Sequence, residues 1–74
     1  MIEDVFVHID VVGISYKVVK KTENWARIRL APEDVPTFKS MFVGEHPYRN
    51  TSGQQVFASV SFIAGTLFDI KVSN

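Results

Sequence analysis

The sequence contains no cysteine, so neither a disulfide nor a thiolate metal site can stabilise this chain of 74 residues. A chain this short buries only about 60% of its unfolded surface, near the lower limit for a single hydrophobic core. Its stability must come from packing or from a partner.

No apolar run approaches the roughly 18 residues of a membrane-spanning helix, and the acidic opening MIEDVFVHID lacks the basic start of a signal peptide. We predict one soluble domain over residues 1–74, in the cytoplasm, or in the host cytoplasm if a phage encodes it.

Sequence patterns that carry catalytic or metal chemistry are also missing. His8 and His46 have no second histidine, cysteine or carboxylate at metal-ligand spacing. The glycines form no phosphate-binding loop, and no serine lies in a nucleophile-turn motif. Glu33 and Asp34 are adjacent acids at a predicted helix start, where helix capping accounts for both. We therefore expect no enzyme activity, no cofactor and no metal.

The chain has no net charge, which by itself argues against a general polyanion binder. Its charges are nevertheless unevenly distributed. The segment KVVKKTENWARIR, residues 17–29, contains five bases and one acid, a net charge of +4, and the rest of the chain carries −4. The same segment contains Trp25, the only tryptophan. The sequence thus predicts a dipolar chain with an aromatic residue among its basic groups.

Apolar residues alternate with polar ones near the start of the chain, which is typical of β-strands. The alternating residues form two sets: Val5, Val7, Ile9 and Val11, then Ile14, Tyr16 and Val18. The phase shifts by one residue at Gly13, where a glycine favours a bulge or a turn. This pattern predicts a long first strand that bends at Gly13.

A hairpin is predicted over residues 15–30. With a three-residue loop at 22–24, its apolar side pairs Tyr16 with Leu30 and Val18 with Ile28. The other side then pairs Lys17 with Arg29, Val19 with Arg27, and Lys21 with Trp25. A two-residue loop would instead pair Val18 with Arg27 and bury a charge, so the longer loop is preferred. Asn24, which ends this loop, is expected to be left-handed.

The rest of the chain predicts a helix, a loop and a second hairpin. A short helix over residues 34–43 is capped by Asp34 and ended by Gly44. Residues 44–55 are rich in turn formers and predict an exposed loop. The second hairpin, with its loop at 64–66, pairs Phe62 with Phe68, Val60 with Ile70, and Ala58 with Val72.

The resulting order, β-β-β-α-β-β, resembles the oligonucleotide/oligosaccharide-binding (OB) barrel. An SH3-like barrel or an open α+β sheet is almost as compatible with it. We therefore predict a mainly β, α+β fold, which is a small five-stranded antiparallel barrel or a highly bent sheet with one short helix near residues 34–43.

Two groups of residues are candidates for binding. The first is the outward face of the 15–30 hairpin, with Lys17, Lys21, Trp25, Arg27 and Arg29. Basic groups around an aromatic side chain are typical of surfaces that bind single-stranded nucleic acid, although a merely solvated face has the same composition. Lys17 faces Arg29, and the repulsion between them would be relieved by a ligand, by a carboxylate of a protein partner, or by Asp10. The second group is Tyr48 and Arg49, in the predicted loop.

A protein partner is the other possibility. Several predicted strands are apolar on both sides, which is more than one small barrel can bury, and exposed apolar residues beside arginine mark protein interfaces. We expect a small non-enzymatic binding module of the kind found among phage accessory proteins. A protein partner, or a second copy in a homodimer, is favoured, so that the chain acts as a regulator, inhibitor or small assembly subunit. The alternative is an OB-like protein that binds single-stranded nucleic acid.

Overall fold

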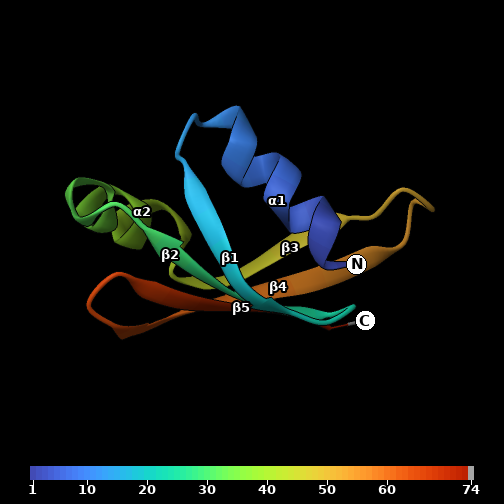
Figure 1. The fold of residues 1–74 in the computed structure, drawn as a ribbon. Helices are drawn as coiled ribbons and strands as arrows, with labels where there is room; N and C mark the ends of the chain where they lie inside the picture. Colours follow the sequence, from blue (N-terminus) through green and yellow to red (C-terminus); the bar gives the residue numbers. More distant parts are fainter. Residues whose placement is uncertain (74) are drawn as a thin grey trace.

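A computed structural model describes residues 1–73 as two helices on one face of a five-stranded antiparallel sheet (Figure 1). In chain order the elements are α1 (Ile2–Val11), β1 (Tyr16–Lys21), β2 (Trp25–Leu30), a 3-10 turn (Pro32–Asp34), α2 (Val35–Phe42), β3 (Gly44–Arg49), β4 (Gln55–Ala64) and β5 (Leu67–Ser73). The strand order across the sheet is β1-β2-β5-β4-β3. None of the helices in residues 1–73 is long and apolar enough to cross a membrane.

The sheet is open, because β1 and β3 form its two edges and do not pair with each other. The predicted barrel, whether OB-like or SH3-like, is therefore wrong, and the open α+β sheet is the alternative that the structure confirms. The number of strands, their antiparallel pairing and the helix near residues 34–43 are confirmed, but the order is α-β-β-α-β-β-β and not the predicted β-β-β-α-β-β. Both helices cover the same face, so the sheet has a core on one side only (Figure 1).

The core fills the space between the two helices and the covered face of the sheet. It consists of Ile2, Val5 and Ile9 of α1, Phe38 of α2, and alternate residues of three strands: Ala26, Ile28, Leu30, Val56, Ala58, Val60, Phe68, Ile70 and Val72. The rings of Phe38 and Phe68 meet edge to face, with centroids 4.7 Å apart. Phe38 is the one buried residue of α2, and Val35 and Phe42 of the same helix also pack against the core.

The first predicted strand is wrong, because residues 2–11 form helix α1. The buried residues Ile2, Val5 and Ile9 are spaced three and four apart, which is the period of a helix face. Val7 and Val11, which strand alternation would place beside Val5, are 59% and 79% exposed. A β-branched residue costs a helix only a few tenths of a kcal/mol, and burial of the apolar face outweighs that cost.

Gly13 ends this helix instead of bending a strand. Its φ of 79° is in the left-handed region, and its N–H donates to the carbonyl of Asp10 at 3.0 Å. A glycine in this conformation just after the last helical residue is a common helix C-terminus. Gly13, where the alternation in the sequence shifts, is therefore a real boundary, but it ends a helix and does not bend a strand.

Residues 44–49 form the edge strand β3, whereas the sequence predicted an exposed loop. They pair with β4 in a regular register that includes Tyr48 opposite Val56 and Pro47 opposite Phe57. Proline is tolerated on an edge strand, where one side of the backbone has no partner strand. Turn-forming residues at 50–54 misled the prediction, since the true turn is confined to them.

The first hairpin combines a two-residue turn with a bulge. Thr22 donates its N–H to the carbonyl of Trp25 at 2.8 Å, which leaves only residues 23 and 24 in the turn. The register then shifts between Val18 and Lys20, and the predicted pairs of Tyr16 with Leu30, Lys17 with Arg29 and Val18 with Ile28 are restored. The predicted pairs of Val19 with Arg27 and Lys21 with Trp25 are wrong. The bulge permits a shorter turn without burying a charge, and left-handed φ values within residues 1–73 are confined to glycines, which excludes Asn24.

The second hairpin is confirmed in its three predicted pairs, but its predicted loop at 64–66 is wrong, because the register shifts between Phe62 and Ala64 and Ala64 pairs with Leu67, which leaves a two-residue turn at 65–66. Phe62 pairs with Phe68, Val60 with Ile70, and Ala58 with Val72. Helix α2 also begins and ends where expected, and Val43, just before Gly44, is already extended. Asp34 occupies the N-cap position, but its side chain makes no capping hydrogen bond. Because Pro36 has no N–H at the second helical position, one of the donors that such a cap normally binds is missing.

Candidate binding face

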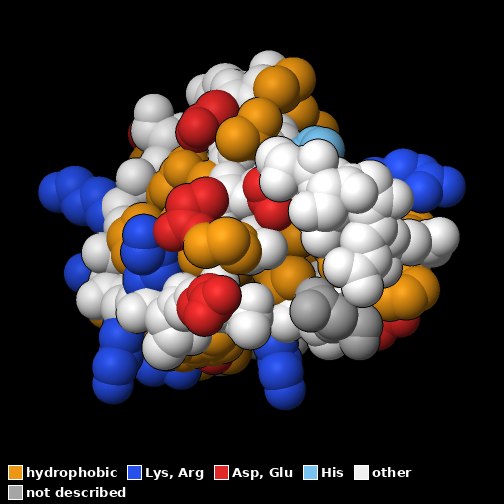
Figure 2. Space-filling view, turned by 90° about the vertical axis from the view of Figure 1, so that its right-hand side faces the viewer, with side chains coloured by type: hydrophobic (Ala, Val, Ile, Leu, Met, Phe, Trp, Pro, Cys, Tyr) orange, Lys and Arg blue, Asp and Glu red, His pale blue; other side chains and the backbone are white. Residues whose placement is uncertain are grey.

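The face of the sheet away from the helices carries most of the basic residues, and we call it the basic face. Strand alternation places on it the charged residues Lys17, Lys20, Arg27, Arg29, Glu45, Arg49, Asp69 and Lys71, together with Trp25. The uncharged residues Pro47, Gln55, Phe57, Ser59, Ser61 and Leu67 share this face. Figure 2 shows Lys and Arg side chains protruding below the molecule, on the side of the sheet away from the helices.

Charge is segregated between the two sides of the molecule. The basic face has six cations and two acids, a net charge of +4, and the rest of the chain has two cations and six acids, −4. The charge asymmetry predicted from the sequence is therefore present, but the charged residues of the basic face are not the same set as those of segment 17–29. Lys21 and Glu23 do not belong to this face, whereas Lys71 and Arg49 join it from strands distant in the sequence. The fold therefore produces a one-sided positive surface on a neutral protein.

Lys21, a predicted member of the site, lies on the wrong face for it. The bulge in β1 places Lys20 opposite Arg27 and Lys21 opposite the buried Ala26, so Lys21 lies on the helix side. There its Nζ contacts the carboxylate of Glu3 in α1 at 2.8 Å. This ion pair lowers the pKa of Glu3, chiefly through the hydrogen bond from Lys21. Lys20, which the predicted site did not include, takes the corresponding position on the basic face.

Trp25, Arg27 and Asp69 form a fixed group near one end of this face. Arg27 donates to both carboxylate oxygens of Asp69, from Nε at 2.7 Å and from Nη2 at 3.1 Å. These hydrogen bonds, and next the negative charge of Asp69, raise the pKa of Arg27. The guanidinium also lies 5.6 Å from the centroid of the half-buried Trp25 ring. Asp69 neutralises Arg27, so this arginine holds the indole in place and adds little free charge.

Lys17 and Arg29 face each other directly across β1 and β2, as predicted. Asp10 does not lie over them. It lies next to the Tyr16 hydroxyl on the helix side, where burial first and Asp10 second raise the pKa of Tyr16. Among the described residues, no carboxylate is within ion-pair distance of Lys17 or Arg29. Two like charges thus stand side by side without an internal counterion.

Tyr48 and Arg49 are adjacent in β3 and therefore point to opposite faces. Arg49 lies at a corner of the basic face, where its Nη1 donates to the carbonyl of Gly53 in the β3–β4 turn at 2.9 Å. Tyr48 lies on the helix side, and its hydroxyl is buried without a hydrogen-bond partner. Burial, and next the charge of Asp4, raise the pKa of Tyr48. The structure thus separates these two predicted contact residues.

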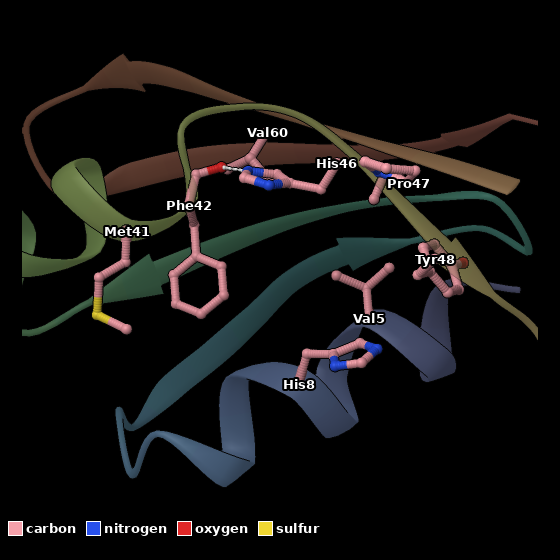
Figure 3. Close-up of a pocket in the computed structure, with 9 residues that line it drawn as sticks. Val5, His8, Met41, Phe42, His46, Pro47, Tyr48 and Val60 are labelled. Atoms are coloured by element: carbon pink, nitrogen blue, oxygen red, sulfur yellow. Dashed lines mark hydrogen bonds between the residues drawn. The ribbon is translucent and has the colours of Figure 1, made fainter.

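Tyr48 lines an apolar cleft of about 210 Å³ between the two helices, which we call the inter-helix cleft (Figure 3). The cleft is lined by Val5, His8, Met41, Phe42, His46, Pro47, Tyr48, Ala58 and Val60. His46 donates from Nε2 to the carbonyl of Phe42 at 2.6 Å, and so ties β3 to the end of α2. His8 meets the Tyr48 ring edge to face at 5.8 Å. Within residues 1–73, no group of three metal-ligating side chains comes together here or elsewhere.

Comparison with known protein families, with curated proteins and with solved structures found no match. Sequence reasoning placed Lys17, Trp25, Arg27 and Arg29 on one face correctly, but it missed Lys20 and Lys71 as members. Alternation along β5 puts Lys71 and Asp69 on one face, yet the sequence does not show that β5 lies beside β2.

Proposed function

We propose that this protein is a small non-enzymatic binding module that binds a polyanionic macromolecule with its basic face. The observation that carries the proposal is the segregation of charge, +4 on one face of a neutral protein. A neutral protein gains no long-range attraction to a polyanion, but a one-sided positive surface attracts and orients one at short range. Lys17 and Arg29 add a local reason, because an anionic group between them would relieve their repulsion.

The structure weakens the original reason for placing a protein partner on the sheet. That reason was an excess of apolar residues on both sides of the predicted strands. Phe6, in the segment predicted as the first strand, belongs to α1 and stacks on the Tyr16 ring with centroids 5.3 Å apart. The exposed apolar residues on the strands are Val18, Val19, Phe57, Phe62 and Ile63. Pairing with the buried Ile28 and Phe68 places Val18 and Phe62 on the helix side, and Phe57 is the one that the strand register places among the charges of the basic face.

Titration with polyanions tests the proposal. At low salt the protein should bind heparin, an oligonucleotide or poly-glutamate, and binding should weaken as salt rises. The double variant K17Q/R29Q should bind at least tenfold more weakly. The matched double variant K21Q/K39Q loses the same charge from the helix side, so its affinity should stay within about twofold of the wild type. Equal losses for the two double variants, or no binding of any polyanion, would refute the proposal.

A protein partner is the second candidate function, and the inter-helix cleft is the observation that favours it. Its volume of about 210 Å³ suits one large apolar side chain, and aromatic and apolar residues line it (Figure 3). The chain would then act as a regulator, an inhibitor or an assembly subunit, and a second copy is the simplest partner. Sedimentation velocity tests self-association, which M41E should abolish and K17Q/R29Q should preserve. A wild-type protein that stays monomeric at high concentration would contradict the homodimer.

A further inference from the structure

We infer that the polyanion bound by the basic face is single-stranded nucleic acid, with Trp25 stacking on a base and Lys17, Lys20, Arg29 and Lys71 contacting phosphates. This inference rests on the proposed function and names its ligand. It depends on three features of the face: the composition of its centre, the position of Trp25, and the arrangement of the cations without an internal counterion.

The centre of the basic face is polar and small. Ser59 and Ser61 of β4 lie opposite Lys71 and Asp69 of β5, and the ion pair of Arg27 with Asp69 lies beside them. An acidic protein partner would normally place an apolar core here and leave the charges at the rim. Serine, lysine and arginine are instead the side chains that contact phosphate and sugar. The composition of the centre thus favours a nucleic acid over a protein.

Trp25 provides the aromatic surface on which a base stacks. It lies at the turn end of β2, directly opposite Lys71 of β5, with Arg27 two residues along the same face. The contact with Arg27 orients the ring before a ligand binds, which reduces the conformational entropy lost on binding. A duplex keeps its bases stacked inside, so only an unpaired base can lie on this indole. The aromatic group therefore selects single strands.

Four cations extend from Trp25 along the neighbouring strands. Lys71 is at one end and the Lys17–Arg29 pair at the other, with Lys20 between them. Trp25 and Arg29 are four residues apart in β2, a separation of about 13 Å along the strand. The two acids of this face are Glu45, which is one strand away from Lys71 across Ser59 of β4, and Asp69, which is paired with Arg27. Four phosphate contacts on a single strand predict that log K falls with log salt at a slope of about −3.

Fluorescence titration tests this inference directly, because Trp25 is the only tryptophan and its emission reports stacking. Oligothymidylate should quench Trp25 and bind with the predicted salt slope. W25A should weaken binding more than tenfold, measured by anisotropy of a labelled oligonucleotide, and W25F should retain part of the affinity. Circular dichroism checks that both variants fold.

Lys20 and Lys21 provide the matched control, since they are adjacent and lie on opposite faces. K20A should weaken oligothymidylate binding and reduce the salt slope by about 0.7, whereas K21A should change neither. Equal effects of K20A and K21A would overturn the inference. Poly-glutamate or duplex DNA that binds as tightly as the single strand would also overturn it, but would leave the proposed function standing. A protein that binds no polyanion at low salt would refute both.

Discussion

Substitution of Val5 and Val7 distinguishes a helix at residues 2–11 from the strand that alternation suggests. In the structure Val5 is 5% exposed and Val7 is 59% exposed. V5A removes two buried carbon groups, worth about 0.8 kcal/mol each, and leaves a small cavity, for a loss of about 2 kcal/mol. V7A removes little buried surface and replaces valine by the best helix former, so it should change the stability by no more than about 0.5 kcal/mol, with a gain favoured.

Urea unfolding measures the difference between these two variants. A domain of this length is stable by about 4–11 kcal/mol, at roughly 0.05–0.15 kcal/mol per residue, so a loss of 2 kcal/mol is large. With a slope near 1 kcal/mol per molar urea, V5A should lower the midpoint by about 2 M, and V7A should leave it within about 0.5 M. In a strand the two valines would share one face, so equal losses in V5A and V7A would refute helix α1.

Three further predictions concern the core, the helix end and the ion pair. F38A should cost about 3–5 kcal/mol in thermal or urea unfolding, whereas F57A should cost at most about 1 kcal/mol because that ring is 39% exposed on the basic face. Similar costs would contradict the assignment of the covered face. G13A should cost about 1–2 kcal/mol because alanine is strained at a φ of 79°, and G13N should cost less. The pKa of Glu3 is lowered by Lys21, so this pair stabilises the fold above the ordinary glutamate pKa and is lost as pH falls through the lowered value. The melting temperatures of wild type and E3Q should therefore differ near neutral pH and converge in acid, and a difference that is independent of pH would contradict this linkage.

The first hairpin shows how a correct rule can lead to a partly wrong site. The prediction rejected a two-residue turn because it would bury Arg27 opposite Val18, and the protein does avoid that pairing. It does so with a bulge, which adds one residue to β1 and reverses the faces of Lys20 and Lys21. A bulge depends on the twist of the strand and on contacts at the edge of the sheet, and neither can be read from the sequence.

The position of β5 beside β2 could not be read from the sequence either. Local pairing within each hairpin is set by turns and alternation, but the neighbour of a hairpin in the sheet is a long-range choice. That choice brings Asp69 to Arg27 and Lys71 to Trp25. The structure therefore turns the isolated cationic hairpin of the prediction into a wider basic face with one neutralised arginine.

The sequence by itself determined the elements whose signals are local: the strand pairs of the second hairpin though not its turn, helix α2, and the shared side of Tyr16, Val18, Ile28 and Leu30 in the first hairpin. Val18 is nevertheless 45% exposed, because β1 is an edge strand. Tertiary structure alone decided the conformation of residues 2–11, because the spacing of their valines and isoleucines fits both the alternation of a strand and one face of a helix. Burial of Ile2, Val5 and Ile9 against the open sheet selects the helix. The same packing covers one face of the sheet and leaves the basic face uncovered.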